Sequence, residues 1–270
     1  MSSLDGTWGY ASADMYTNRW ALIEPNLGES DFVLVDWGSD AGWFSLAVAK
    51  AFPLSSVISV EAGIMSDGQG LRMHGDKMKA YGVENNVIVD CVFGPATFEA
   101  LQAVPADYQL VLSVFHHMGN VFGTQLNRIE EWNDAFCDLL RGANVTFFEV
   151  PNEDNPGETP HKIREWYGDR NLETIIQSAM QHGGVSASVE LLGEIEHGAK
   201  GTRKLFKISL MEPAEPATAQ AIEAHIRSAS RLLKIPAYSR FRMTVSRFLR
   251  QFRNDRTPLV REHLSEKLPK

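Results

Sequence analysis

Residues 33–45 read VLVDWGSDAGWFS: an apolar run, a turn of small residues and then apolar residues at helical spacing. The run Phe32–Asp36 is typical of a buried strand, and Trp43–Ala51 is typical of a helix. Gly38 and Gly42 let the turn approach a ligand closely. The N–H groups of the turn and of the helix start can bind an anion or a carboxylate. The stretch therefore predicts a strand, a ligand-binding turn and a helix.

Strand-like and helix-like segments alternate after this stretch. The predicted strands are Phe32–Asp36, Ser56–Val60, Asn86–Val89, Gln109–Phe115, Ala143–Val150, Val185–Leu192 and Arg203–Leu210. The predicted helices are Trp43–Ala51, Asp67–Tyr81, Phe98–Val104, Leu126–Leu140 and part of Ile163–His182. This order predicts an α/β fold with a doubly wound, mostly parallel seven-stranded sheet that ends in a hairpin. A C-terminal helical extension is expected to follow it.

An acidic residue, Glu61, lies about 23 residues after Gly38, at the end of the second predicted strand. A carboxylate at this place can accept hydrogen bonds from ribose hydroxyls. The turn, the helix and the acid together favour a ligand that carries a ribose. The alternatives are a tight turn of any doubly wound fold for the glycines and a solvated acid for Glu61.

Residues 36–45, DWGSDAGWFS, resemble motif I of class I S-adenosylmethionine-dependent methyltransferases, in particular members with Gly-[Ser/Ala/Cys]-Asn-x-Gly-Tyr-Phe-Ser. Residues 18–27 are similar to the entry segment of that family. Residues 59–62 resemble motif II, and residues 114–118 resemble the end of the fourth strand. The resemblance covers about residues 10–210. It implies a methyltransferase, an enzyme of the transferase class, with S-adenosylmethionine as its cofactor.

The resemblance implies a role for each matching residue. Gly38 and Gly42 would pass under the methionine part of the cofactor, and Asp36 would order the turn. Glu61 would hold the ribose, with Ala62 beside it. The remaining implied contacts are Ser39 and Asp40 in the turn, Asp90 and Cys91 near the adenine amine, and Ser113 near the methyl group. An ordinary turn residue is the alternative interpretation of Asp90.

Two positions bear on which family the turn resembles. Asp40 stands where Gly-x-Gly-x-Gly has its middle glycine, and Asn or Asp occurs there in the resembling subgroup. Position 45 is Ser, whereas a dinucleotide-binding turn has a third glycine there, so a nicotinamide-dependent oxidoreductase matches less well. The other alternative is a non-catalytic, methyltransferase-like scaffold or regulator, which Asp40 and the extension motivate.

Two adjacent histidines, His116 and His117, follow the fourth predicted strand and are the candidate catalytic residues. Methyl transfer mainly requires the acceptor to lie about 3 Å from the methyl carbon. A hydroxyl acceptor also needs a base, and histidine titrates in the right range. One of the pair is expected to be structural, because neighbouring side chains face different ways. An anionic acceptor needs no base, and the pair and nearby arginines would then bind charge.

The expected acceptor is an oxygen on a small molecule or on a glycan- or lipid-linked intermediate. Residues 113–116 read SVFH, where nitrogen methyltransferases that act on nucleic-acid bases often carry Asp/Asn-Pro-Pro-Tyr/Phe, so a nucleic-acid acceptor is disfavoured. No metal site is predicted, because the histidines lack ligand spacing. The residues expected around the acceptor or as a lid are Glu149, Asn152, His161–Arg170, Tyr10, Tyr16, Arg19 and Trp20, with packing or a solvated loop as the alternative.

Charge is distributed unevenly along the 270 residues. The segment from Ala221 onward carries 12 Lys and Arg against 4 Asp and Glu, and the preceding part carries 14 against 30. The sequence predicts an α/β domain over residues 1–212 and a basic extension over 213–270. Within the extension, Tyr238–Phe252 predicts a basic amphipathic helix. Its three interpretations are packing on the acidic body, peripheral contact with an anionic membrane surface, and binding of a nucleic acid or another acidic partner.

Composition excludes several classes of protein. A hydrophobic fraction of 44% and a charged fraction of 22% are typical of a folded protein. The two cysteines cannot form a disulfide scaffold and favour a reducing compartment. The sequence shows no signal peptide and no apolar run of membrane-spanning length. We therefore expect a cytoplasmic protein, or one that binds the inner face of a membrane peripherally through residues 238–252.

Overall fold

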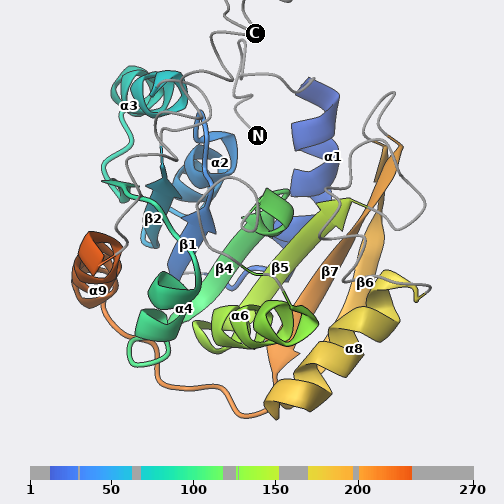
Figure 1. Cartoon of the computed structure of the whole chain (residues 1–270). Coiled ribbons are helices and arrows are strands. Elements are labelled where there is room, and N and C mark those ends of the chain that lie inside the picture. The colour runs from blue at the N-terminus through green and yellow to red at the C-terminus, as the bar shows by residue number, and fades with distance from the viewer. Residues whose placement is uncertain are drawn as a thin grey trace, which may run out of the picture. The chain divides into compact units, whose positions relative to one another are not determined.

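A seven-stranded sheet forms the centre of the computed structural model (Figure 1). Its strands are β1 (Val33–Trp37), β2 (Ser56–Glu61), β3 (Asn86–Asp90), β4 (Ala106–Leu112), β5 (Ala143–Pro151), β6 (Ala187–Glu196) and β7 (Thr202–Leu210). Their order in space is β3-β2-β1-β4-β5-β7-β6. Strands β1 to β5 are parallel, and β7 is antiparallel to both β5 and β6. The structure describes residues 13–29, 31–62, 68–117, 126, 128–151, 170–196 and 201–232.

Helices cover both faces of the sheet. The layer seen in front in Figure 1 contains α4 (Pro95–Leu101), α6 (Ile129–Arg141) and α8 (Leu172–Gly183), with α9 (Ala219–Leu232) beside α4. The opposite layer contains α1 (Ala13–Ile23), α2 (Trp43–Ala51) and α3 (Gln69–Tyr81). Two short 3-10 turns are η1 (Glu24–Asn26) and η2 (Phe115–His117). The predicted α/β fold with a doubly wound, mostly parallel seven-stranded sheet is confirmed.

Consecutive residues of the central strands face opposite layers. Phe148 packs in the core under α6, whereas Phe147 packs in the core under α1 and α2. On β1, Val35 packs in the same core as Phe148, and Leu34 packs in the same core as Phe147. Because both faces are covered, these strands are apolar runs without polar alternation. The edge strand β6 is mostly exposed or half-buried, and it carries a bulge between Leu191 and Gly193.

Both ends of β4 differ from the sequence prediction. The predicted strand Gln109–Phe115 begins and ends three residues too late, because β4 is Ala106–Leu112. Its start was missed since Asp107 is a poor strand former; its carboxylate accepts a hydrogen bond from the Val33 N–H at 2.8 Å. Its end is set by Ser113, whose φ of 60° leaves the strand conformation.

Helix α9 and the segment before it are attached to the α/β body. Ile222 and Ile226 are fully buried in the core beside α4. The side chain of Asn144 makes two hydrogen bonds with the backbone of Ala214, at 2.8 and 2.9 Å. Contacts group Met1–Leu233 together and Lys234–Lys270 separately, whereas the sequence placed residues 213–270 together. The predicted basic helix Tyr238–Phe252 lies outside the described residues.

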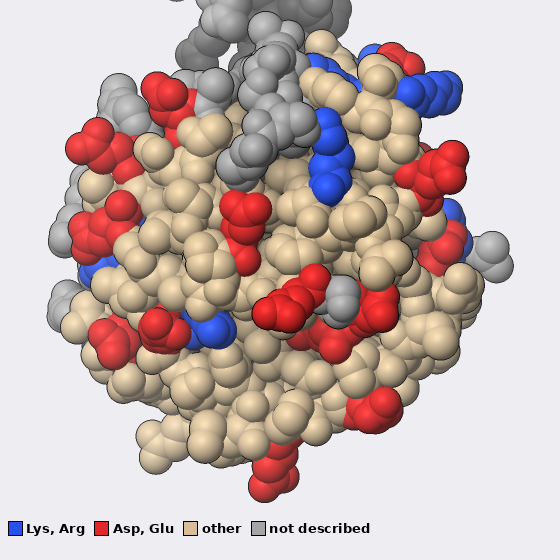
Figure 2. All heavy atoms as spheres, turned by 180° about the vertical axis from the view of Figure 1, so that it is seen from behind, with Lys and Arg blue, Asp and Glu red and all other residues tan. Residues whose placement is uncertain are grey.

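The surface of the body agrees with its acidic composition. Figure 2 shows acidic side chains scattered over the rear face, with fewer basic side chains between them and no basic patch covering that face. Within the described part of the chain, no helix is both long and apolar enough to cross a membrane. The cytoplasmic location and the peripheral membrane contact stay predictions.

Candidate functional site

The glycine turn links β1 to α2 at the carboxyl edge of the sheet. The N–H groups of Gly38 and Ser39 both donate to the carbonyl oxygen of Val60 on β2, at 2.8 and 3.1 Å. The Gly42 N–H donates to the Ser39 carbonyl at 2.8 Å. Three residues of the turn have positive φ: Gly38 at 70°, Asp40 at 48° and Gly42 at 81°. The turn is therefore held against β2 by its own backbone.

Both glycines are required by packing as well as by conformation. A Cβ on Gly42 would lie 2.2–2.4 Å from ring atoms of His74 on α3. A Cβ on Gly38 would lie 2.6 Å from a methyl group of Val114, which follows β4. The sequence interpretation considered only the approach of a ligand. The structure adds that α3 and the end of β4 pack directly against the turn.

Glu61 lies at the end of β2, next to the glycine turn. Its Oε2 accepts a hydrogen bond from the Asp40 N–H at 3.0 Å, and only 9% of the residue is exposed. Asp40 occupies the left-handed region, which Asp and Asn tolerate better than other non-glycine residues. This conformation gives a physical reason for an acid where the related motif has glycine. Burial raises the pKa of Asp40, and a backbone hydrogen bond from Ala41 partly offsets that increase.

The other predicted cofactor contacts surround this contact. Asp90 on β3 pairs in register with Glu61, and its side chain is exposed. The N–H of the buried Cys91 donates to the Glu61 carbonyl at 3.1 Å. Ala62 is half-buried beside Glu61. The buried hydroxyl of Ser39 has no hydrogen-bond partner among the described residues, which suits a polar group of a bound ligand.

A buried chain of polar side chains runs from Asp36 to α3. The Ser45 hydroxyl lies 2.5 Å from the Asp36 carboxyl and 2.7 Å from the Ser59 hydroxyl. Ser59 also lies 2.7 Å from Asn86 Oδ1, and Asn86 Nδ2 lies 2.9 Å from His74 Nε2. Burial raises the pKa of Asp36 to about 6 and lowers that of His74 to about 4. His74 is therefore neutral at pH 7.

Counting the hydroxyl hydrogens shows in which protonation state of Asp36 every hydrogen bond between these polar side chains can form. Each hydroxyl carries one hydrogen. When Asp36 is ionised, Ser45 donates to it, and the single Ser59 hydrogen serves either Ser45 or Asn86. When Asp36 is protonated, hydrogens run from Asp36 through Ser45 and Ser59 to Asn86, and every contact is satisfied. The geometry therefore agrees with the raised pKa of Asp36.

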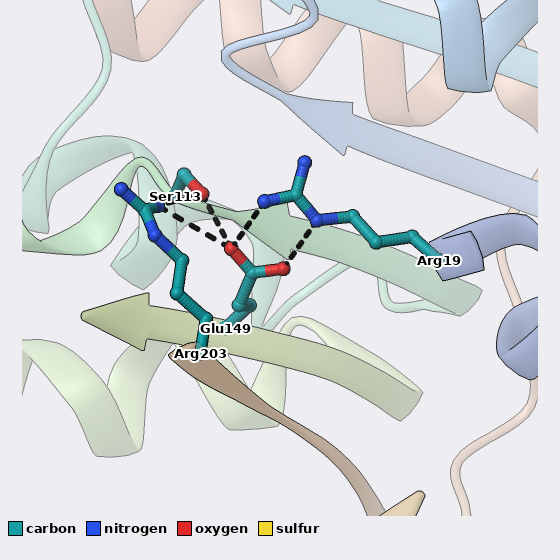
Figure 3. Close-up of polar contacts among 4 residues, drawn as sticks. All are labelled: Arg19, Ser113, Glu149 and Arg203. Carbon is teal, nitrogen blue, oxygen red and sulfur yellow. Dashed lines mark hydrogen bonds and ion pairs between the residues drawn. The ribbon is translucent and has the colours of Figure 1, made fainter. Parts of the chain in front are cut away.

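Ser113 belongs to an ionic cluster at the carboxyl ends of β4 and β5 (Figure 3). Its hydroxyl donates to Glu149 Oε1 at 2.6 Å. Arg19 of α1 grips both oxygens of Glu149, with Nε to Oε2 at 2.6 Å and Nη2 to Oε1 at 2.8 Å. Arg203 of β7 contacts the Ser113 hydroxyl and lies 3.3 Å from Glu149 Oε1. Three side chains, from α1, from the residue after β4 and from β7, thus converge on one carboxylate of β5.

The two candidate catalytic histidines form η2 after this cluster. Phe115 anchors the turn in the core, where its ring contacts Trp132, Phe136 and Phe148. The rings of His116 and His117 lie 4.0 Å apart between centroids. His116 is buried and His117 is half-buried, so the adjacent side chains differ in exposure. Among the described residues, no group of three or more metal-ligating side chains is found.

Sequence reasoning missed several residues of this region. His74 of α3 is fully buried, whereas the apolar Leu71, Met78 and Tyr81 of the same helix are half-buried. The available signal was the presence of polar residues in otherwise apolar strands, such as Ser59 in β2. Arg203 could not be found in this way, because β7 contains several other polar residues. Asn152, His161–Asp169 and Tyr10 lie outside the described residues.

Comparisons with known proteins agree with the geometry at the level of the fold. Neither a protein-family model nor a curated protein matches the sequence. The structure is similar to magnesium protoporphyrin IX methyltransferase from Synechocystis PCC 6803, solved with bound S-adenosylhomocysteine. That match has a TM-score of 0.50 and 13% identity, and it covers 76% of this chain and 90% of the other. The fold is therefore that of class I S-adenosylmethionine-dependent methyltransferases.

Two further solved structures are similar at lower scores. A SAM-dependent methyltransferase from Aquifex aeolicus has a TM-score of 0.45 and 13% identity, with 72% of this chain and 93% of that chain covered. EvdMO1 has a TM-score of 0.49 and 14% identity. The match covers 76% of this chain but only 44% of EvdMO1, so this chain spans less than half of that protein.

Proposed function

We propose that this protein is an S-adenosylmethionine-dependent methyltransferase that methylates an oxygen of a small molecule or of a glycan- or lipid-linked intermediate. One observation carries the proposal: the Asp40 N–H of the glycine turn donates to the Glu61 carboxylate at 3.0 Å. A turn that binds the methionine part and an acid that binds the ribose have to be adjacent, and here they touch. The fold, shared with methyltransferases, supports the same conclusion.

The residues present fit such a cofactor. Gly38 and Ser39 would hold the methionine part, and the Ser39 hydroxyl would find the partner that the described residues do not supply. Glu61 would accept hydrogen bonds from the ribose, with Asp90 and Cys91 beside the base. When bound, S-adenosylmethionine supplies a methyl group activated by a sulfonium. The chain itself then has to position the acceptor and exclude water.

His117 is the better placed of the two histidines to act on an acceptor. It is half-buried, whereas His116 is buried beside Phe115. A neutral imidazole in hydrogen-bond reach of an acceptor hydroxyl can remove its proton as the oxygen attacks the methyl carbon. His116 then acts as a packing partner for the His117 ring, 4.0 Å away.

Ser45 argues against a nicotinamide-dependent oxidoreductase. Dinucleotide-binding folds have glycine at this position because helix and strand pack closely there. Here the Ser45 hydroxyl is buried against Asp36 at 2.5 Å and belongs to the polar chain. A glycine would leave the Asp36 carboxyl without its nearest partner.

Calorimetric titration with S-adenosylmethionine and with NADH tests the proposal. We expect the first ligand to bind, and Glu61→Ala to weaken it about tenfold or more through lost hydrogen bonds to a charged group. Glu190→Ala, on the exposed edge strand, is the matched control and should bind as wild type. No binding at millimolar S-adenosylmethionine would support the scaffold alternative, and tight NADH binding the oxidoreductase. Unchanged binding by Glu61→Ala would refute the ribose assignment.

A further inference from the structure

Arg19 has a donor nitrogen, Nη1, to which none of the described residues bonds. Its Nε and Nη2 are engaged by Glu149, at 2.6 and 2.8 Å. A guanidinium is a rigid, planar fork of five N–H donors. Gripping Glu149 on one edge therefore directs Nη1 away from that carboxylate, as Figure 3 shows. No acceptor among the described residues bonds to Nη1, although the residue is only 4% exposed.

The surroundings of Arg19 hold it in a single position. Glu149 is completely buried and is itself fixed by the hydroxyl of Ser113 at 2.6 Å and by Arg203. Tyr16, one helical turn before Arg19, stacks on Trp43 with ring centroids 5.3 Å apart. A guanidinium fixed in this way loses little side-chain freedom when a ligand binds to its remaining nitrogen.

The cluster lies on the acceptor side of the sheet. The chain order reverses between β1 and β4, which is where ligands bind in open α/β sheets. The glycine turn and Glu61 belong to β1 and β2, on one side of this point. Arg19, Ser113 and Glu149 gather over β4 and β5, on the other side. Ser113 adjoins Val114, which packs against Gly38, so the two sides are in contact.

We propose that Arg19 binds a carboxylate or phosphate group of the methyl acceptor, and that Glu149 is a positioning residue that orients the guanidinium. The inference rests on the proposed function and narrows its substrate class to anionic acceptors. Carboxylate and phosphate oxygens match the guanidinium fork and make charge-assisted hydrogen bonds with it. Two guanidinium groups already share one carboxylate here, which favours a further negative charge at the open nitrogen.

Titration of the full-length protein with inorganic phosphate and with acetate tests the proposal, with and without saturating S-adenosylhomocysteine. Wild type is expected to bind phosphate at millimolar concentrations, and Arg19→Gln to bind it about tenfold more weakly. The affinity for S-adenosylhomocysteine should stay within about twofold. The matched control is Arg227→Gln, which removes an arginine from a half-exposed pair on α9 and should leave both affinities unchanged.

The results of these titrations distinguish an anionic group of the methyl acceptor from the carboxylate of the cofactor as the ligand of Arg19. Phosphate affinity unchanged by Arg19→Gln, or no phosphate binding by wild type, contradicts the proposal. A tenfold loss of S-adenosylhomocysteine affinity with phosphate affinity retained would assign Arg19 to the carboxylate of the cofactor instead. If wild type fails to bind S-adenosylhomocysteine, the proposed function fails, while the ligand-free phosphate titration still decides whether Arg19 binds an anion.

A second measurement covers the case in which Arg19→Gln does not fold. Wild-type crystals soaked with selenate locate an anion directly through its anomalous signal. A selenate within hydrogen-bond distance of Arg19 Nη1 supports the site. Selenate bound elsewhere on the molecule, with none at Arg19, overturns it.

Discussion

Asp36 and Glu149 are both carboxyl groups buried in parallel strands of the same sheet, but their partners differ. Asp36 meets the hydroxyl of Ser45, at the head of a chain of neutral groups. Glu149 meets the guanidinium groups of Arg19 and Arg203. Burial raises the pKa of Asp36 to about 6, the hydrogen bonds with Ser45 lower it, and the nearby Glu61 carboxylate raises it. The same sheet thus buries one carboxyl group among hydroxyl groups and the other between two guanidinium groups.

The two regions should therefore fail differently when a member is removed. In the ionic cluster, loss of the carboxylate leaves buried cations facing each other. In the polar chain that starts at Asp36, protonation of Asp36 or its replacement by asparagine leaves every hydrogen bond intact.

Glu149→Ala is expected to lower the free energy of unfolding by about 3–5 kcal/mol, because it strips two buried guanidinium groups of their shared counterion. Urea unfolding followed by circular dichroism measures the change. Glu131→Ala is the matched control, since Glu131 pairs with an Arg128 side chain that is 70% exposed. That variant should lose about 1 kcal/mol or less, because Glu131 also accepts the Arg128 N–H at the start of α6. Equal losses in the two variants would contradict the role assigned to burial.

The second prediction concerns the pH dependence of stability. The folded pKa of Asp36, about 6, lies above its ordinary value of 3.8, so the folded state holds the proton more tightly than the unfolded state. The favourable contribution is complete below pH 3.8 and is lost as the pH rises through 6. A shift of this size corresponds to about 3 kcal/mol.

Asp36→Asn should remove this dependence, because the amide keeps a donor toward Ser45 and carries no charge. We expect the variant to be more stable than wild type at pH 7.5, by up to about 3 kcal/mol. Urea unfolding at a series of pH values between 4 and 8 measures the difference. Asp76→Asn on the exposed face of α3 serves as the control and should follow the wild-type profile. A parallel profile for Asp36→Asn would show that Asp36 is not the group responsible.

The third prediction concerns the packing of α3 against the glycine turn. Gly42 and Gly184 both have positive φ, at 81° and 64°. A Cβ at Gly184 would meet nothing within 4 Å, whereas one at Gly42 would overlap the His74 ring. Alanine at Gly184 should cost about 1–2 kcal/mol from conformation alone. Alanine at Gly42 should cost about 1–3 kcal/mol more, and similar losses at the two sites would deny the contact.

Much of the fold could be predicted because its signals are local. The apolar runs on either side of the glycine turn predict a strand at Phe32–Asp36, which the structure places at Val33–Trp37, and a helix at Trp43–Ala51, which matches α2 residue for residue. The position of Glu61 beside that turn also follows, because parallel strands bring their carboxyl ends to one edge. The shift of β4 could not be predicted, since Asp107 is stabilised by the Val33 N–H, 74 residues away.

The ionic cluster is less visible in the sequence for a related reason. Arg19 and Glu149 are 130 residues apart, and Arg203 comes from the last strand. No spacing rule links them, because their meeting depends on the order of strands in the sheet. His74 was missed because a lone histidine on an amphipathic helix has no periodic signal. Such residues are found only once the topology is known.

The smallest expected effect concerns the backbone of Ser113. Ser113→Ala loses the hydrogen bond to Glu149, at a cost of about 1.5–3 kcal/mol, and keeps the unfavourable φ of 60°. Ser113→Gly loses the same bond but relieves about 1–2 kcal/mol of strain. Glycine should therefore be the more stable of the two variants by about 1 kcal/mol, after its backbone entropy is counted. At Ser188 on β6 the order should reverse, because glycine in a strand costs about 0.5–1 kcal/mol relative to alanine. The same order at both sites would mean that Ser113 is held in place by its hydroxyl alone.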